Sequence, residues 1–342
     1  MTPIIIAGPC SIESLDQLRT VTTLLVNQLS TSHELWIRGG VWKPRTRPGG
    51  FEGQGEEALH WMAQLKKEMP AARFCCEVAT PEHVELCLRY SVDAVWIGSR
   101  TTGNPFSVDE VCSALKGSTL PVMVKNPMTP DVKLWLGAIE RVMQAGTSKV
   151  SAVHRGFTPY HNTLYRNNPL WEVPIELRRL MPDLPLLCDP SHIGGQSDYI
   201  GPLMQTAMDL HFDGLMVEVH PQPSSALTDA SQQLTPAAFF ALLDRLKLHQ
   251  DCSVPRELIL LRQQIDLVDS QIMEALGNRL RLAKRIAQVK ADNNMAVFQP
   301  KRWEEVLAHK MHLAQDAGID PQFVKEIYEK IHSESVKVQL EN

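Results

Sequence analysis

Short apolar runs in the first 220 residues each end in a residue that can bind a metal ion, an anion or a proton. The eight runs end at or near Cys10, Arg38, Glu77, Arg100, Lys125, Arg155, His192 and Glu218. Thiolate, imidazole and carboxylate groups are ligands of divalent metals, and guanidinium groups suit phosphate. This repetition predicts one active face where a metal site and an anion site meet.

The elements that position these residues alternate regularly. Helix-length amphipathic segments separate the apolar runs, which indicates βα units and a parallel sheet buried on both faces. Eight such units over residues 1–248 predict an α/β fold of the TIM (β/α)8 type, with its active site where the strands end. A doubly wound open sheet would instead gather its ligands at one switch point.

Composition limits the class of protein. The chain has 342 residues and a net charge of −5, so no general basic excess points to nucleic acid. No basic segment with an apolar core precedes Pro3, and no run of 18 apolar residues occurs, which predicts a soluble, cytoplasmic protein without membrane contact. The seven cysteines show no paired CxxC spacing and are expected to be reduced thiols.

Four residues near strand ends predict a metal site. They are Cys10, His192, Glu218 and Asp229. A mixed set of sulfur, nitrogen and oxygen ligands suits one divalent ion of the manganese, iron, cobalt or zinc type. Any one of these residues alone is better explained as a buried thiol or a hydrogen-bonded loop side chain. Four of them at one end of a barrel favour a metal.

Cations form a second group at the same end of the predicted barrel. The group contains Arg38, Lys43, Arg45, Arg100, Lys125 and Arg155. A lone arginine after a strand is usually a solvated surface residue. Six cations converging on one small mouth indicate anionic ligands, for which arginine supplies a planar fork and lysine a point charge.

At these residues the barrel resembles 3-deoxy-D-arabino-heptulosonate 7-phosphate synthases. The matching motifs are AGPCS at 7–11, RGG..KPRT at 38–46, IGSR at 97–100, VK at 124–125, HRGF at 154–157, DPSH at 189–192 and VEVHPQPSSALTD at 217–229. The resemblance implies that Cys10, His192, Glu218 and Asp229 bind the metal, that Arg100, Lys125 and Arg155 hold phosphoenolpyruvate, and that Lys43, Pro44, Arg45 and Thr46 hold erythrose 4-phosphate. Arg38 would lie between the two substrates.

The resemblance also implies catalytic roles. Lys43 is the expected proton donor to the aldehyde oxygen, while Lys125 is a phosphoenolpyruvate ligand and Glu77, paired with it, orients or deprotonates the attacking water. A structural ion pair in the barrel mouth is the alternative reading of Glu77. A sister sugar-acid synthase or metal aldolase remains an alternative for the whole barrel, which a panel of aldose phosphates would test.

The pattern changes near residue 250. The last barrel helix is expected from Pro236 to Leu248, and the polar stretch HQDCSVP at 249–255 is a plausible linker. Residues 256–342 then predict an all-helical domain, with helices from Arg256 to about 293, from Pro300 to about 317 and from Pro321 to the C-terminus. Three helices of such unequal length make a poor monomeric core, so we expect a dimer.

The long helix carries cations on its apolar face. Arg279 falls in register with Ile272 and Ile286, so a carboxylate partner or an anionic ligand must offset its burial. Lys290 shares this face at about 16 Å from Arg279. Arg262 stands about 25 Å before Arg279, too far to touch the same small ligand, so it would serve a second site.

This arrangement resembles the all-helical chorismate mutases over residues 255–342. The matching positions are Arg262, Arg279, Lys290, Arg302, Ser335 and Gln339. The resemblance implies a homodimer in which Arg262 crosses to the partner's site, a clamp on chorismate and prephenate with Arg279 and Lys290 as catalytic cations, and no cofactor. Gln299 and Trp303 replace the family's usual acidic pair, which affects contacts to the ring hydroxyl of chorismate.

The tail has an alternative reading as a non-catalytic dimerisation and sensing module that binds prephenate or an aromatic amino acid. Both readings favour control of the barrel through the tail. Several reaction steps separate the product of the barrel from chorismate, so fusion cannot channel an immediate intermediate. Feedback by prephenate, with 249–255 as a hinge, is the expected reason for the fusion.

Overall fold

The chain is described by a computed structural model that covers residues 3–43, 49–147, 149–160, 163–248 and 256–341. It divides into two compact units, 1–250 and 251–342, which are described separately below. No described helix is both long and apolar enough to cross a membrane.

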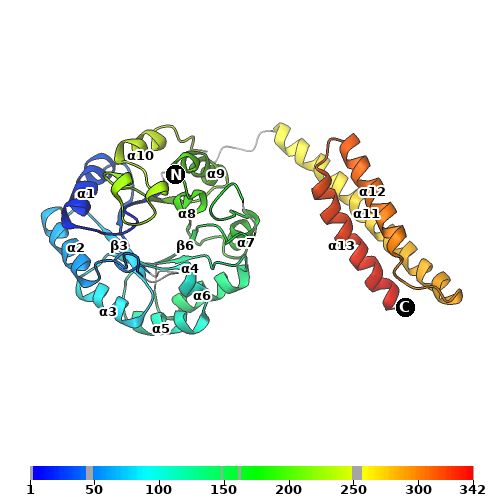
Figure 1. Cartoon of the computed structure of the whole chain (residues 1–342), viewed down its shortest axis with the longest axis horizontal. Coiled ribbons are helices and arrows are strands. Elements are labelled where there is room, and N and C mark those ends of the chain that lie inside the picture. Colours follow the sequence, from blue (N-terminus) through cyan, green and yellow to red (C-terminus); the bar gives the residue numbers. More distant parts are fainter. Residues whose placement is uncertain (1–2, 44–48, 148, 161–162, 249–255, 342) are drawn as a thin grey trace. The chain divides into compact units, whose positions relative to one another are not determined.

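The first unit is a closed barrel of parallel strands in chain order (Figure 1). The strands are β1 (Ile4–Gly8), β2 (Leu35–Arg38), β3 (Phe74–Val78), β4 (Ala94–Ile97), β5 (Val122–Lys125), β6 (Val150–His154), β7 (Leu186–Cys188) and β8 (Gly214–Glu218). The pairing of Gly8 with Glu218 closes the barrel between β1 and β8. The predicted TIM-barrel fold is confirmed.

Helices surround the strands (Figure 1). They are α1 (Leu15–Leu29), α2 (Glu56–Glu68), α3 (Pro81–Arg89), α4 (Ser99–Thr102), α5 (Pro105–Leu115), α6 (Val132–Gln144), α7 (Glu172–Leu180), α8 (Pro190–Gly194), α9 (Ile200–Asp209) and α10 (Pro236–Leu243), with short 3-10 turns at Ser197–Tyr199, Pro223–Ser225 and Ala230–Gln232. Helix α6 shows how a capping residue and an apolar face determine such a helix. The Asp131 side chain caps its first turn, and Trp135, Ala138, Ile139 and Val142 bury one face against the barrel.

The barrel interior changes character along its axis. An apolar layer consists of Ile6, Cys75, Ala94, Trp96, Met123, Val153, Leu187 and Met216. At the carboxyl ends of the strands, Arg38, Lys125 and Glu218 are also buried. Charged groups therefore form the floor of the mouth that the strand ends create.

Helix α10 is shorter than predicted. It ends at Leu243 rather than at Leu248, because the chain tightens into i to i+3 hydrogen bonds from Arg245 and Leu246. The Gln205 side chain then accepts from the Lys247 amide at 3.0 Å and donates to the Lys247 carbonyl at 3.1 Å. These bonds replace the helical partners of Lys247. The predicted linker at 249–255 lies outside the described residues.

The second unit contains α11 (Arg256–Asp292), α12 (Pro300–Asp316) and α13 (Pro321–Leu340). Helix α13 packs against both other helices. The predicted starts at Arg256, Pro300 and Pro321 are confirmed. Within one chain the apolar stripe of α11 remains largely open to solvent, with Ile265 and Ile272 exposed by 59% and 50%. This exposure agrees with the expectation of a poor monomeric core.

Candidate active sites

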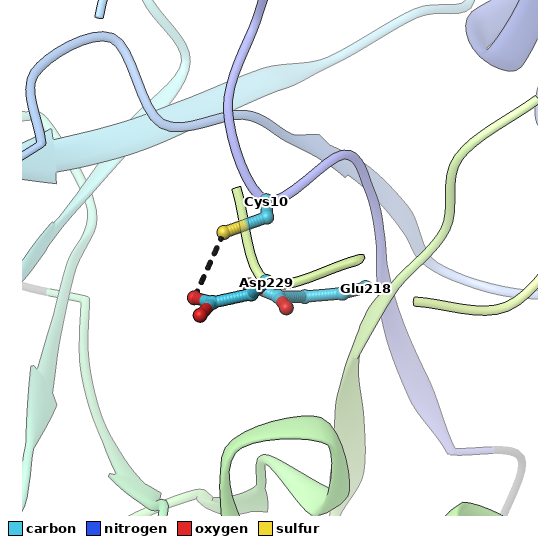
Figure 2. Close-up of side chains that lie close together, drawn as sticks. All are labelled: Cys10, Glu218 and Asp229. Carbon is cyan, nitrogen blue, oxygen red and sulfur yellow. Dashed lines mark hydrogen bonds between the residues drawn. The ribbon is translucent and has the colours of Figure 1, made fainter. Parts of the chain in front are cut away.

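Three of the four predicted metal ligands converge in the barrel mouth (Figure 2). Cys10 follows β1, Glu218 ends β8, and Asp229 lies in the loop after β8. The ligand atoms of these three residues all lie within 4.8 Å of one another. A thiol and two carboxylates this close provide a donor set for a divalent ion.

The backbone and an arginine together aim Asp229 at this site. Asp229 has a φ of +47°, in the left-handed region that aspartate tolerates better than most residues. Arg166 Nη1 donates to Asp229 Oδ1 at 2.9 Å and to Gln232 Oε1 at 2.6 Å. Burial opposes ionisation, but the Arg166 guanidinium lowers the pKa of Asp229 below its ordinary value. The carboxylate is therefore ionised and ready to bind a cation.

His192 stands beside this cluster. Its Nε2 lies 3.7 Å from Glu218 Oε1, while its Nδ1 lies 2.8 Å from Asp189 Oδ2. Burial lowers the pKa of His192, which favours the neutral imidazole that binds metals. A carboxylate behind the second ring nitrogen is the usual means of orienting a metal-binding histidine.

Glu218 and Cys10 also carry atoms that a metal ion could bind. Glu218 Oε2 accepts from Gln232 Nε2 at 2.7 Å, while its buried Oε1 lies 3.0 Å from Arg38 Nη2 without a well-directed hydrogen bond among the described residues. The Cys10 thiol donates to Asp229 at 3.3 Å and accepts from Lys43 Nζ at 3.0 Å. Burial and the nearby Glu218 raise the pKa of Cys10 to about 12. The thiol is thus neutral on its own, and a bound cation would displace its proton. These donors fit a divalent metal.

The anion site adjoins the metal ligands. Lys125 Nζ donates to Asp189 Oδ2 at 2.7 Å, and Arg155 Nη1 donates to the Asn167 side chain at 2.7 Å. Arg155 makes no ion pair with any described residue, and burial together with Arg166 and Arg100 lowers its pKa to about 10. A buried guanidinium without a carboxylate partner is suited to an anionic ligand.

Arg38 lies deeper than the other cations. It is 1% exposed, its Nη2 lies 3.0 Å from Glu218 Oε1, and its guanidinium carbon lies 5.2 Å from the centre of the Trp96 ring. Arg38 thus links the metal ligands to the barrel interior. Arg100, in the first turn of α4, is exposed at the rim. Pro44, Arg45 and Thr46 lie outside the described residues.

The expected ion pair between Glu77 and Lys125 is wrong: it does not occur among the described residues. Lys125 pairs with Asp189, because the Asp189 carboxylate lies fully buried beside it. Glu77 instead accepts a hydrogen bond from the Trp96 ring nitrogen at 2.9 Å. Glu77 remains close enough to influence the charge of Lys125 but does not form its ion pair.

The tail brings four of its predicted residues together. Arg279 donates to the Ser335 hydroxyl and to the Ile331 carbonyl. Lys290 donates to the Gln339 side chain at 3.2 Å and to the Val297 carbonyl. Within the described part of the chain neither cation pairs with a carboxylate. The two cations therefore suit an anionic ligand between α11 and α13, as their place in an apolar stripe predicts.

The two remaining tail arginines lie apart from this group. Arg262 is an exposed residue of α11, 17 positions and about 25 Å before Arg279. Arg302 lies on α12, 70% exposed, with its Nη1 3.0 Å from the Glu305 carboxylate. Neither contacts the Arg279 group within one chain.

Comparison with known proteins finds a family match for each of the two units. Residues 2–250 match the family model described as the DAHP synthetase I family, where DAHP is 3-deoxy-D-arabino-heptulosonate 7-phosphate. The chain belongs to this DAHP synthase family. Residues 261–340 match the model described as chorismate mutase type II. The chain is therefore an enzyme that joins a DAHP synthase barrel to a chorismate mutase tail.

Individual relatives support each half. A phospho-2-dehydro-3-deoxyheptonate aldolase of Thermotoga maritima is 30% identical over 71% of this DAHP synthase and 68% of the relative. A crystal structure of that Thermotoga maritima enzyme superposes with a TM-score of 0.63 at 29% identity, over 71% of this chain and 68% of the other. A 4-amino-4-deoxychorismate mutase of Streptomyces pristinaespiralis is 32% identical over 24% of this chain and 63% of the relative.

Sequence reasoning missed several residues of the DAHP synthase site. Asp189 contacts both Lys125 and His192, and its place one helical turn before His192 in DPSH was an available signal. Arg166 and Asn167 lie in the loop after β6, where Arg166 contacts Asp229, 63 positions away, and Asn167 contacts Arg155, 12 positions away. Gln232 is an uncharged side chain in a turn. Loop polarity alone does not distinguish such residues from solvated ones.

Proposed function

We propose that the barrel catalyses the metal-dependent condensation of phosphoenolpyruvate with erythrose 4-phosphate to DAHP and phosphate. The observation that carries this proposal is the adjacency of two sites. Three metal-ligand atoms within 4.8 Å of one another share the mouth with the buried cations Lys125 and Arg155. A reaction between an aldehyde and a phosphorylated enol needs both an electrophilic centre and anion binding.

Cys10, His192, Glu218 and Asp229 would hold one divalent ion of the manganese, iron, cobalt or zinc type. When bound, such an ion supplies Lewis-acid polarisation of a carbonyl oxygen. Lys43, whose ammonium contacts the Cys10 sulfur at 3.0 Å, stands where it can give a proton to the aldehyde oxygen as negative charge develops there.

The cations place the other substrate. Arg100, Lys125 and Arg155 would hold phosphoenolpyruvate, with Arg38 between the substrates, and Lys43 to Thr46 would hold erythrose 4-phosphate. The C3 carbon of phosphoenolpyruvate forms a bond to the aldehyde carbon, water adds at C2, and phosphate leaves with carbon–oxygen cleavage. Glu77 would orient or deprotonate that water from its position on β3.

A substrate panel tests the barrel. The full-length chain, loaded with manganese, should consume erythrose 4-phosphate with phosphoenolpyruvate and release one phosphate per turnover. Arabinose 5-phosphate should be at least tenfold poorer in kcat/KM. A preference for the pentose phosphate would instead assign the barrel to a sister sugar-acid synthase.

We also propose that the tail, residues 256–342, rearranges chorismate to prephenate as a homodimer. Arg279, Lys290, Ser335 and Gln339 supply donors to the two carboxylates and the ether oxygen, and Arg262 and Arg302 would add charge, Arg262 from the partner chain. The exposed stripe of α11 supports dimerisation, because solvent would otherwise cover it. The relative from Streptomyces pristinaespiralis gives 4-amino-4-deoxychorismate as a second candidate substrate.

The tail is further proposed to regulate the barrel. It holds a site for chorismate and prephenate, and 249–255 would act as the hinge between the domains 1–248 and 256–342. Ligand in the tail would inhibit condensation. A non-catalytic sensing tail is the alternative, and turnover of chorismate by the full-length chain distinguishes the two.

A further inference from the structure

An aromatic pair borders the cation pocket of the tail. The rings of Trp303 on α12 and His332 on α13 stack with their centroids 4.0 Å apart and an interplanar angle of 16°. His332 lies three residues before Ser335 and seven before Gln339, so the three share one face of α13. The stacked pair therefore adjoins the pocket that contains Arg279 and Lys290.

His332 has an unused polar atom. Its Nε2 is buried and has no hydrogen bond among the residues that the structure describes. Burial, Arg279 and Lys290 all lower the pKa of His332, so its imidazole is neutral at pH 7. Buried polar atoms in proteins almost always have partners, and a neutral imidazole can donate or accept a hydrogen bond. The unpaired nitrogen thus points to a polar group on a ligand.

The charge of the pocket restricts which polar group of a ligand can face His332. Arg279 and Lys290 are cations without a carboxylate contact among the described residues. The carboxylate nearest to Arg302 belongs to Glu305, which is 66% exposed on α12. A further positive charge on the ligand would therefore lie near Arg279 and Lys290 without a protein carboxylate contact to stabilise it among the described residues, whereas a neutral hydroxyl needs none.

We propose that Trp303 and His332 select the ring substituent of the tail's substrate. The His332 imidazole hydrogen-bonds a ring hydroxyl, Trp303 holds the imidazole in place, and the pocket, whose cations contact no carboxylate in the described part of the chain, rejects an ammonium at the same position. The inference rests on the mutase function proposed above. It assigns chorismate as the substrate and excludes the amino analogue, in which an ammonium replaces that hydroxyl.

Turnover of both compounds by the full-length chain tests this selection. His332→Phe keeps the stack on Trp303 and removes both ring nitrogens, so kcat/KM for chorismate should fall about tenfold. His332→Asn should restore part of the loss by returning a polar group. Trp303→Glu adds a carboxylate and should raise the ratio of amino analogue to chorismate turnover at least tenfold. His309→Phe, on the exposed face of α12, is the matched control and should change neither rate.

The outcomes separate the two levels of the proposal. Wild-type protein that turns over both compounds equally, or a His332→Phe variant with an unchanged chorismate rate, would overturn the selection while leaving the mutase function intact. If neither compound is turned over, both the selection and the mutase function are overturned. Thermal unfolding of each variant, followed by circular dichroism at 222 nm, identifies any loss that comes from misfolding, and His332→Asn then decides the question at a temperature where it is folded.

Discussion

Lys125 and His192 contact the same carboxylate oxygen. Oδ2 of Asp189 lies 2.7 Å from Lys125 Nζ and 2.8 Å from His192 Nδ1. One buried carboxylate therefore orients a proposed phosphoenolpyruvate ligand and a proposed metal ligand at the same time. Burial opposes its ionisation, yet the neighbouring His192 and Lys125 keep the pKa of Asp189 well below its ordinary value. The two halves of the site are thus coupled through one charge.

Asp189→Asn should weaken both halves. Removing the charge behind a metal-binding histidine typically lowers metal affinity by about 10- to 100-fold, and the loss of the Lys125 partner should raise the KM for phosphoenolpyruvate. Metal titration and steady-state kinetics measure the two effects. Asp244→Asn, at the exposed end of α10, is the control. A change in only one of the two quantities would contradict the coupling.

Chelation should separate the two activities. Treatment with EDTA should abolish condensation and leave chorismate turnover largely intact, because the thiol, imidazole and carboxylate donors lie in the barrel. Cys10→Ala should mimic the chelator. Parallel assays of both reactions on one sample provide the measurement, and equal loss of both activities would show that the metal site is wrongly assigned.

Arg155→Ala should raise the KM for phosphoenolpyruvate at least tenfold and that for erythrose 4-phosphate much less. A charge-assisted hydrogen bond to a buried anion is worth about 1.5–3 kcal/mol. Arg179→Ala, which removes an exposed arginine of α7, should leave both constants unchanged. Arg45→Ala is expected to show the reverse preference. If Arg155→Ala weakens both substrates alike, the separate assignment of the two phosphates fails.

His154 should make the barrel sensitive to acid. Its ring is fully buried, 5.3 Å from the Trp171 ring and 5.6 Å from the Phe157 ring, and burial lowers its pKa to about 3. Between that pKa and its unfolded value near 6.5, only the unfolded chain binds the proton. The free energy of unfolding is therefore highest above pH 6.5 and falls as the pH drops through this window.

The contribution of His154 should be about 1 kcal/mol between pH 7 and pH 5.5. Denaturant unfolding followed by tryptophan fluorescence at both pH values gives the difference. His154→Leu should lose about that much less stability on acidification than the wild type, whatever its stability at pH 7. His60→Leu, which replaces an exposed histidine of α2, should retain the wild-type response. An unchanged response in His154→Leu would show that other groups cause the acid sensitivity.

Arg279→Ala in the full-length chain should remove both mutase activity and inhibition of condensation by prephenate. Prephenate should inhibit the wild-type barrel through a coupling of about 1–3 kcal/mol, and Arg281→Ala, on the exposed side of α11, should keep both properties. Condensation rates with and without prephenate measure the coupling. Full inhibition of the Arg279→Ala variant would place the effector site outside the tail pocket.

The barrel could be predicted from sequence because its signals are local. Each strand is a short apolar run, and several neighbouring helices open at a proline or a capping polar residue that is visible in the chain, as at Ser14, Thr80 and Thr235. The end of α10 could not be predicted, since it depends on Gln205, a residue of α9 about 40 positions away whose amide bonds to Lys247. Local patterns carry no information about such partners.

The site residues also divide into those that local sequence could predict and those that it could not. Residues that follow strands, such as Cys10 and Glu218, must meet at one end of a barrel, so their type and position sufficed to predict a cluster. Arg166 reaches Asp229 from a loop, over 63 positions. The Glu77 pairing failed because Asp189, from another strand end, lies 2.7 Å from Lys125, and charge alone does not show which of two carboxylates in the barrel mouth forms the ion pair.

Arg38 occupies the interior of a barrel, where branched apolar side chains are the rule. Its Nε and Nη1 atoms are buried without hydrogen bonds among the described residues. Removing Arg38 alone would leave the Glu218 carboxylate buried without its cation, which is strongly destabilising, whereas apolar replacement of a whole buried ion pair is often neutral or stabilising. A variant library sorted for heat resistance alone would therefore lose Arg38 and Glu218 only together, whereas one sorted for condensation would retain both.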